Sequence, residues 1–293
     1  MESKISLSII TLTKNRAQLL EKCLASLEGQ LSNADEIIVI DNNSTDDTPK
    51  VILKKKQALP IQTYKTAMSG YPNLYNLAIT KSTKQIVVFL DDDCEAAKNF
   101  LSQIRERFRK KLGFVLQGKT LSLPRNNIFA EISEDHLTNW IYGNMVKKNM
   151  LSVIDNRNVA IPRTIIEKIG GFSNDMVLGS EDVEMGMRLF IAGIPIIYDP
   201  QLLTFHHERT ALKTFLLQHL RIAKSHAALD KKLSQDQKIS MVNKHTGKRH
   251  IRSFFLREIE YWRKKRYKDL FYLPLIYVLL AAVRIIGYLR VFR

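Results

Sequence analysis

Short apolar runs alternate with helical patterns along the first part of the chain. The runs are too short for helices of ordinary length and lack polar alternation, which indicates strands buried on both faces. Between them, apolar residues recur at helical spacing, as at Leu20, Leu24 and Leu27. This order predicts a parallel sheet with crossover helices in an α/β domain. The expected strands are residues 5–12, 36–40, 61–64 and 86–90, and the expected helices are residues 19–27, 48–57 and 73–80.

The fourth apolar run ends in three adjacent carboxylates, Asp91, Asp92 and Asp93. Open α/β sheets bind ligands beyond the carboxyl ends of their strands, which is where these acids lie. The acids repel one another, and a hard divalent cation such as Mg²⁺ or Mn²⁺ would relieve that repulsion together with the oxygens of a phosphate. The alternative is a solvated acidic turn before the helix expected to start near Asn99.

Two other strand ends belong to the same edge of the predicted sheet. The first strand ends at residues 11–14, and the second ends at Asp41 in a segment rich in turn and capping residues. In a parallel sheet these ends share one crevice with the acidic triplet. The first strand is followed by neither a Gly-x-Gly-x-x-Gly nor a Walker-type loop, which argues against a dinucleotide-binding domain.

The middle of the chain predicts further strands and helices around a second acidic pair. The helical spacing of residues 101–112 precedes a fifth strand at 114–117, and residues 121–150 look like an irregular excursion with some helix. Strands are expected at 159–161, 194–198 and 202–205, and a short helix at 163–169. Glu181 and Asp182 open a helix closed by Gly193, where either a helix cap or a ligand-facing role fits the acids. His206 and His207 end the last strand, as surface residues or as metal ligands.

Charge and cysteine content restrict the possible partners. The chain has 293 residues and a net charge of +16, which implies a polyanionic partner such as nucleic acid, an anionic membrane or a phosphate-bearing substrate. Cys23 and Cys94 have no metal-ligand spacing and indicate no disulfide framework, which favours a reducing cytosolic compartment. The apolar run at residues 5–12 is shorter than the core of a signal peptide and lacks a cleavage site, so a strand is expected there.

Much of the positive charge lies in the last quarter of the chain. An amphipathic helix is expected at residues 212–220, followed by a polar segment at 231–248. After that segment, residues at helical spacing form an apolar face with basic residues beside it. Such a helix suits the headgroup region of an anionic membrane, although its face could instead pack on the first domain. The adjoining apolar run favours a membrane over nucleic acid. The apolar face is Ile251, Phe254, Phe255, Ile259 and Trp262, and the basic residues are Arg252, Arg257, Arg263, Lys264, Lys265, Arg266 and Lys268.

The apolar run at residues 270–283 is interrupted by Pro274. As a helix it rises about 21 Å against a hydrocarbon thickness of about 30 Å, so it does not span alone. Extension to Phe292 places Arg284 near the middle, at a cost of about 2.5–3.5 kcal/mol on insertion scales. An interfacial or re-entrant anchor is therefore favoured over a span. The expected domains are residues 1–210 and 211–293.

With these motifs placed, residues 6–207 resemble the family 2 glycosyltransferases of the GT-A fold. The resemblance rests on residues 8–16, 36–46 and 89–93, on Gly170-Gly171-Phe172 and on Glu181-Asp182, in that order. It implies a Rossmann-like, mixed but mainly parallel sheet flanked by helices. It also implies an inverting, metal-dependent transfer of a sugar from a nucleotide donor to an acceptor hydroxyl.

The resemblance also implies roles for individual residues. Asp182 would be the general base, Gly171 and Glu181 would lie on the acceptor side, and Asp93 with His206 or His207 would bind Mg²⁺ or Mn²⁺. Asp41 would contact the base, and Asp91 or Asp92 the ribose. The full set of expected donor-binding residues is Thr11, Thr13, Asn15, Arg16, Asp41, Asn43, Asp91 and Asp92.

The expected partners are a UDP-, dTDP- or GDP-linked sugar, a lipid-linked or cell-envelope glycan and an anionic membrane, without nucleic acid. The expected location is the cytoplasmic face of a bacterial cell membrane. Two alternatives remain at this point. A sugar nucleotidyltransferase shares the sheet and the carboxylates but normally needs a glycine-rich loop after the first strand, and residues 11–16 contain no glycine. A non-catalytic, membrane-bound module would bind nucleotide sugar without transferring it.

Overall fold

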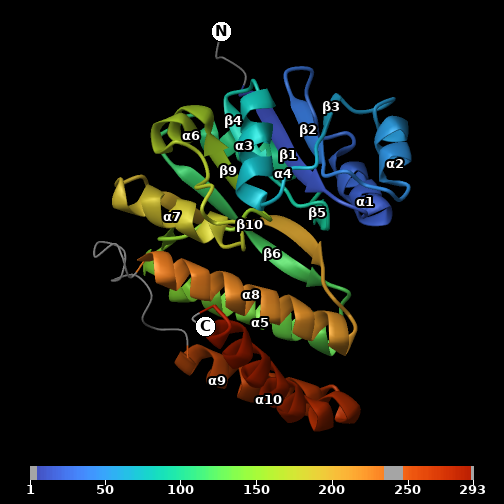
Figure 1. Ribbon diagram of the computed structural model, residues 1–293, viewed down its shortest axis with the longest axis vertical. Coiled ribbons are helices and arrows are strands. Elements are labelled where there is room, and N and C mark those ends of the chain that lie inside the picture. The colour runs from blue at the N-terminus through green and yellow to red at the C-terminus, as the bar shows by residue number, and fades with distance from the viewer. Residues whose placement is uncertain (1–4, 234–246, 292–293) are drawn as a thin grey trace. The chain divides into compact units, whose positions relative to one another are not determined.

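A computed structural model describes residues 5–233 and 247–291 of the protein (Figure 1). Its described residues form a 10-stranded sheet with the order β3-β2-β1-β4-β9-β6-β10-β8-β7, and β5 pairs with β10 off this path. The strands are β1 (Leu7–Thr13), β2 (Glu36–Asp41), β3 (Ile61–Lys65), β4 (Ile86–Phe89), β5 (Cys94–Ala96), β6 (Val115–Leu123), β7 (Met145–Lys147), β8 (Met150–Leu151), β9 (Val159–Pro162) and β10 (Ile196–His207).

The parallel pairing predicted from the sequence holds for the first four strands. Ile9 lies opposite Ile37 of β2 on one side and Val88 of β4 on the other, both in parallel register. Beyond β4 the direction changes, because β9 pairs antiparallel with both β4 and β6. The expected mixed sheet flanked by helices is confirmed.

Helices cover both faces of this sheet. Side chains alternate across each strand, so Ile9, Val39 and Val88 join one hydrophobic cluster with α1 (Ala17–Leu27), α2 (Thr48–Lys55) and α4 (Phe100–Phe108). On the other face, α3 (Tyr71–Lys81) presents Tyr75, whose ring meets Phe89 edge-on with centroids 5.4 Å apart. The helices α6 (Arg163–Ile169) and α7 (Glu181–Ile191) follow β9 in the chain. The fully buried strands explain the continuous apolar runs.

Several expected elements have different extents in the structure. Residues 121–150 are more regular than expected, because β6 continues to Leu123 and α5 (Ile128–Gly143) follows, capped by the Asn127 side chain. The two strands expected at 194–198 and 202–205 form the single strand β10. Leu112 lies beyond α4, and Ile191 is exposed at the end of α7. The merger of the two expected strands arises because β10 continues across the short polar interruption between them.

The chain divides into two compact units. Unit 1 comprises residues 1–121, 146–177 and 181–207, and unit 2 comprises residues 122–145, 178–180 and 208–293. The boundary expected near residue 210 stays a prediction. Unit 2 contains α5, α8 (Leu212–Leu233), α9 (Gly247–Arg263) and α10 (Tyr267–Leu289). The proline at position 274 does not break α10, whose ends lie beyond the expected apolar run. Residues 234–246 of the expected polar segment lie outside the described residues, as do the side chains of Ile251, Arg252 and Phe254.

The helix α7 approaches the loop between β8 and β9 closely, and this contact generates a stability prediction. A Cβ added at Gly186 would lie 2.5 Å from the Ile154 nitrogen and 2.6 Å from the Val153 Cα. Overpacking of this kind costs about 1–3 kcal/mol, whereas alanine gains about 1 kcal/mol over glycine in a helix. We expect Gly186→Ala to lower the free energy of unfolding in urea, so an unchanged or higher value would contradict this packing. In the control Gly113→Ala the new Cβ would meet only the Lys111 side chain, at 3.4 Å.

Candidate functional site

The acidic triplet is positioned by contacts from β1 and α3. The chain leaves β4 at Phe89, and the Thr11 hydroxyl donates to the Leu90 carbonyl at 2.9 Å, which fixes the turn that follows. The Tyr75 hydroxyl donates to Asp91 Oδ1 at 3.0 Å. Burial, and after it the charge of Asp93, raise the pKa of Asp91 to about 7. The buried triplet therefore holds more negative charge than its surroundings stabilise.

Arg16 supplies part of the missing positive charge. Its Nη1 lies 2.6 Å from Asp92 Oδ1 and 2.7 Å from Asp93 Oδ2. Burial raises the pKa of Asp92 to about 6 even though Arg16 opposes the shift. Arg16, placed by the loop after β1, therefore binds two of the three acids at once.

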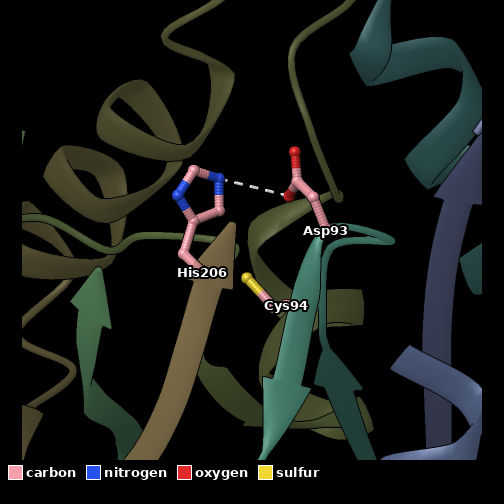
Figure 2. A group of neighbouring side chains, drawn as sticks. All are labelled: Asp93, Cys94 and His206. Carbon is pink, nitrogen blue, oxygen red and sulfur yellow. Dashed lines mark ion pairs between the residues drawn. The ribbon is translucent and has the colours of Figure 1, made fainter. Parts of the chain in front are cut away.

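Asp93 also meets a histidine from the end of β10. His206 Nε2 lies 3.2 Å from Asp93 Oδ1, and Figure 2 shows the ring and the carboxylate facing each other. Ligand atoms of Asp93, Cys94 and His206 lie within 4.8 Å of one another. A carboxylate and an imidazole suit Mn²⁺ or Mg²⁺, with further positions filled by phosphate oxygens and water. Cys94 suits it less, because burial raises the pKa of its thiol well above the ordinary value and keeps it protonated.

The neighbouring histidine points to a different partner. His207 Nε2 lies 2.5 Å from Glu95 Oε1, on the other side of the strand from His206. The sequence left the choice between the two histidines open. In the structure the His206 ring faces the Asp93 carboxylate, whereas His207 contacts Asp93 through its backbone amide, which donates to the Asp93 carbonyl at 2.8 Å.

The expected base-binding residues form a corner between the ends of β1 and β2. Asn15 Oδ1 accepts from the Thr45 amide at 2.7 Å, and the Asn15 amide donates to the Ser44 hydroxyl at 2.9 Å. The Ser44 amide in turn donates to Asp41 Oδ1 at 2.9 Å. Asn15 and Asn43 both have positive φ, a conformation that asparagine tolerates. Arg16 connects this corner with the triplet. Thr13 is buried at the end of β1.

The second acidic pair begins α7. Glu181 is buried, whereas Asp182 is half-buried and accepts from the Val183 amide at 2.8 Å. Burial, and after it the charge of Asp155, raise the pKa of Asp182 to about 6, although Arg157 opposes the shift. A half-buried carboxylate with such a pKa is ionised near neutrality and remains basic enough to accept a proton.

Three residues that the sequence analysis did not select connect the two acidic groups. Burial, then Asp91, Glu181 and Asp182, raise the pKa of Tyr75, so all three acids lie near one phenol. Arg157 Nε lies 2.9 Å from Asp155 Oδ1, and its charge lowers the pKa of both Asp91 and Asp182. In the sequence Tyr75 lies within the helix expected at residues 73–80, and Asp155 and Arg157 lie just before the strand expected at 159–161, so no local cluster marked them.

Gly171 has a local structural requirement for glycine. Its φ is +70°, and an added Cβ would lie 2.6 Å from the Asn76 side-chain oxygen. That oxygen accepts from the Phe172 amide at 2.9 Å, and the Gly171 carbonyl accepts from Arg188 at 2.7 Å. An acceptor-side role for Gly171 stays a prediction.

The family model described as Glycosyl transferase family 2 matches residues 8–170, more than half of the chain. The chain belongs to glycosyl transferase family 2. The match covers the strand ends that carry Asp41 and the acidic triplet, together with Asp155 and Arg157. The predicted family is confirmed.

Two curated relatives of this family 2 chain match it over part of their length. A GalNAc(5)-diNAcBac-PP-undecaprenol beta-1,3-glucosyltransferase of Campylobacter jejuni is 34% identical over 133 residues, which are 43% of this chain and 42% of the relative. An O-antigen biosynthesis protein of Myxococcus xanthus is 25% identical over 223 residues, which are 69% of this chain and 17% of the relative. The chain therefore matches less than half the length of either protein.

A solved structure supports the fold over nearly the whole chain. A mannosyltransferase from Pyrobaculum calidifontis, in complex with GDP-Man and Mn²⁺, aligns with a TM-score of 0.69. The alignment covers 98% of this chain and 86% of the other, at 16% identity. The expected GT-A fold is confirmed.

The geometry around Asp93 generates a prediction for metal binding. We expect His206→Ala and Asp93→Asn each to weaken Mn²⁺ binding at least about tenfold in calorimetric titrations with UDP present, because each removes a ligand atom. The control His207→Ala removes the neighbouring imidazole, which faces Glu95. The Mn²⁺ affinity of this variant should equal that of the unmodified protein. Equal losses in the two histidine variants would contradict this assignment.

Proposed function

We propose that the protein is an inverting, metal-dependent glycosyltransferase. In this proposal it transfers a sugar from a UDP-, dTDP- or GDP-linked donor to a hydroxyl of a lipid-linked or cell-envelope glycan. The observation that carries the proposal is the meeting of two acidic groups around Tyr75. The triplet with His206 offers a site for a cation and a diphosphate, and the half-buried Asp182 offers a base.

The donor side of the proposal uses the strand ends of β1, β2 and β4. Asp41 and the Asn15–Asn43 corner would bind the nucleoside, and Asp91 or Asp92 the ribose. Asp93 and His206 would hold Mg²⁺ or Mn²⁺, which stabilises charge on the departing diphosphate when bound. Arg16, which pairs with Asp92 and Asp93, would hold these two carboxylates in place. The mannosyltransferase complex with GDP-Man and Mn²⁺ supports this class of donor and cation.

On the acceptor side, Asp182 would take the proton from the attacking hydroxyl. The oxygen then attacks the anomeric carbon from the face opposite the diphosphate, and the bond between that carbon and the diphosphate breaks as the new bond forms. One base in this position produces inversion. Glu181 and the Gly171 turn would border the acceptor. The undecaprenol-linked substrate in the name of the Campylobacter jejuni relative supports a lipid-linked acceptor, and hence the cytoplasmic face of a bacterial membrane.

A screen of nucleotide sugars tests the activity itself. The purified full-length chain with Mn²⁺ should hydrolyse or transfer from at least one UDP-, dTDP- or GDP-linked sugar, and the product should have the anomeric configuration opposite to that of the donor. A retained configuration would overturn the inverting mechanism. Metal-dependent UDP binding without turnover on any donor would instead favour the non-catalytic module.

Replacement of the proposed base gives a second prediction. We expect Asp182→Asn to reduce kcat by about 10²–10⁴-fold, the usual contribution of a general base. Binding of UDP with Mn²⁺ should be unchanged, because Asp182 is not one of the proposed cation ligands. Substantial transfer by Asp182→Asn would place the base elsewhere. Asp175→Asn is the matched control in the loop before α7 and should retain full kcat.

The pH profile should depend on the charges around Asp182. Because burial raises its pKa to about 6, the base is protonated below that pH, and kcat should fall about tenfold per unit there. Arg157→Gln removes a charge that lowers this pKa, so the fall should begin at higher pH. Asp155→Asn removes a charge that raises it, so the fall should begin at lower pH. Shifts in the same direction for both variants would contradict the assignment.

A further inference from the structure

The helix α10 of unit 2 has one buried and one exposed apolar face. Leu273, Ile276 and Leu280 join a hydrophobic cluster with Ile128 of α5 and Phe215 of α8. The opposite stripe is exposed and apolar at intervals of three, four or seven residues, like one face of a helix. Its members are Phe271 (78% exposed), Leu275 (53%), Val278 (66%), Ile285 (59%) and Leu289 (54%).

The buried face of α10 continues to the end of the helix. A Cβ at Gly287 would lie 2.8 Å from Ala223 Cβ and 2.9 Å from the Leu220 carbonyl oxygen, so the backbones of α8 and α10 approach closely there. Apart from its buried positions, α8 carries many charges, including Arg221 and Lys224. A helix that is packed along its length on such a neighbour cannot enter lipid on all sides.

Arg284 adds a second attachment of α10 to its own unit. Its Nη2 lies 3.2 Å from Nδ1 of both His136 on α5 and His219 on α8. Burial and the Arg284 charge lower the pKa of His219 to about 3, so its imidazole stays neutral and accepts from the guanidinium. The charge that would be costly in the middle of a membrane span therefore points toward protein and away from the exposed stripe.

Positive charge borders the exposed apolar surface. Phe255, Ile259 and Trp262 of α9 are exposed, Trp262 to 66%. Arg257 and Arg266 are bound internally, to Asp135 and Glu131 respectively. By contrast, three other basic residues of this region form no ion pair with a carboxylate in the described part of the chain. They are Arg263, Lys265 and Lys268.

We propose that α9 and α10 form a membrane-docking surface that lies in the plane of one anionic leaflet, and that α10 does not cross the bilayer. The length of α10 alone would permit a crossing, since 23 residues rise about 34 Å against about 30 Å of hydrocarbon. Its packing decides otherwise, because only one face is available to lipid. The exposed stripe enters the acyl boundary, and the free lysines meet anionic headgroups. This inference concerns unit 2 and does not depend on the proposed transfer chemistry.

Labelling of the two ends of α10 tests the in-plane orientation. Full-length Lys268→Cys and Arg290→Cys are expressed in bacteria, and sealed inverted membrane vesicles are treated with a membrane-impermeant maleimide. The native Cys23 and Cys94 are fully buried, and the unmodified protein controls for their reaction. We expect both introduced thiols to react from the cytoplasmic side without detergent. Protection of one end until detergent is added would overturn the proposal in favour of a span.

Surface variants test the lipid contact independently. The triple variant Phe271→Ser, Val278→Ser, Ile285→Ser removes three exposed side chains, and we expect at least a tenfold loss of sedimentation with phosphatidylcholine–phosphatidylglycerol vesicles. The matched control Leu53→Ser removes an equally exposed leucine (69%) from α2 of unit 1 and should bind as before. Binding of UDP with Mn²⁺ should persist in both variants, which separates this test from that of the donor site.

Lipid composition and self-association complete the test. In a Trp140→Phe background, the fluorescence of Trp262 should shift to the blue on vesicles that contain phosphatidylglycerol, and high salt should weaken the shift. Unchanged vesicle binding by the triple variant would overturn the proposal. A lipid-free dimer of the unmodified chain that the triple variant cannot form would also overturn it, because a second copy would then cover the surface.

Discussion

Crowding of buried carboxylates is the constraint on which unit 1 depends. Asp91, Asp92 and Asp93 follow one strand, and Asp155 lies close enough to raise the pKa of both Asp91 and Asp182. Two guanidinium groups partly compensate, Arg16 for the triplet and Arg157 for the second group. Because the protein supplies fewer cationic groups than acids here, the site has a standing preference for added positive charge. In the proposed function a divalent ion bound by Asp93 and His206 would supply that positive charge.

The same crowding separates two carboxylates by function. Burial raises the pKa of both Asp92 and Asp182, in each case to about 6. Their partners differ, because Arg16 pairs with Asp92 and Asp93, whereas Asp182 stands at the start of α7 and accepts from the Val183 amide. Both groups lie near Tyr75. Environment, and not residue type, distinguishes the proposed donor site from the proposed base.

The first half of the fold was predictable because parallel strands buried on both faces leave continuous apolar runs. The antiparallel strands beyond β4 were harder to predict, since β10 crosses a polar interruption at Asp199-Pro200-Gln201 that is typical of a loop.

In the site, the triplet and the Glu181-Asp182 pair were visible as local clusters. Asp155 and Arg157 were not, because their importance comes from charges contributed by segments distant in sequence. The side of β10 on which each histidine lies follows from alternation, but the partner on each side, Asp93 or Glu95, required the fold.

The apolar C-terminal helix illustrates a different limit of sequence reasoning. Length and hydropathy are the same for a helix that crosses a bilayer and one that lies on it, and α10 passes the test for a candidate span with a mean hydropathy of 2.1. The discriminating residues are the ones that look unfavourable or neutral in sequence. Arg284 would be costly in lipid, yet it donates to two imidazoles of its own unit. Gly287 has no side chain to offer lipid, yet it permits the close approach of α8. A charge and a glycine therefore locate the protein-facing side of α10, and the apolar residues that remain define the side left for lipid.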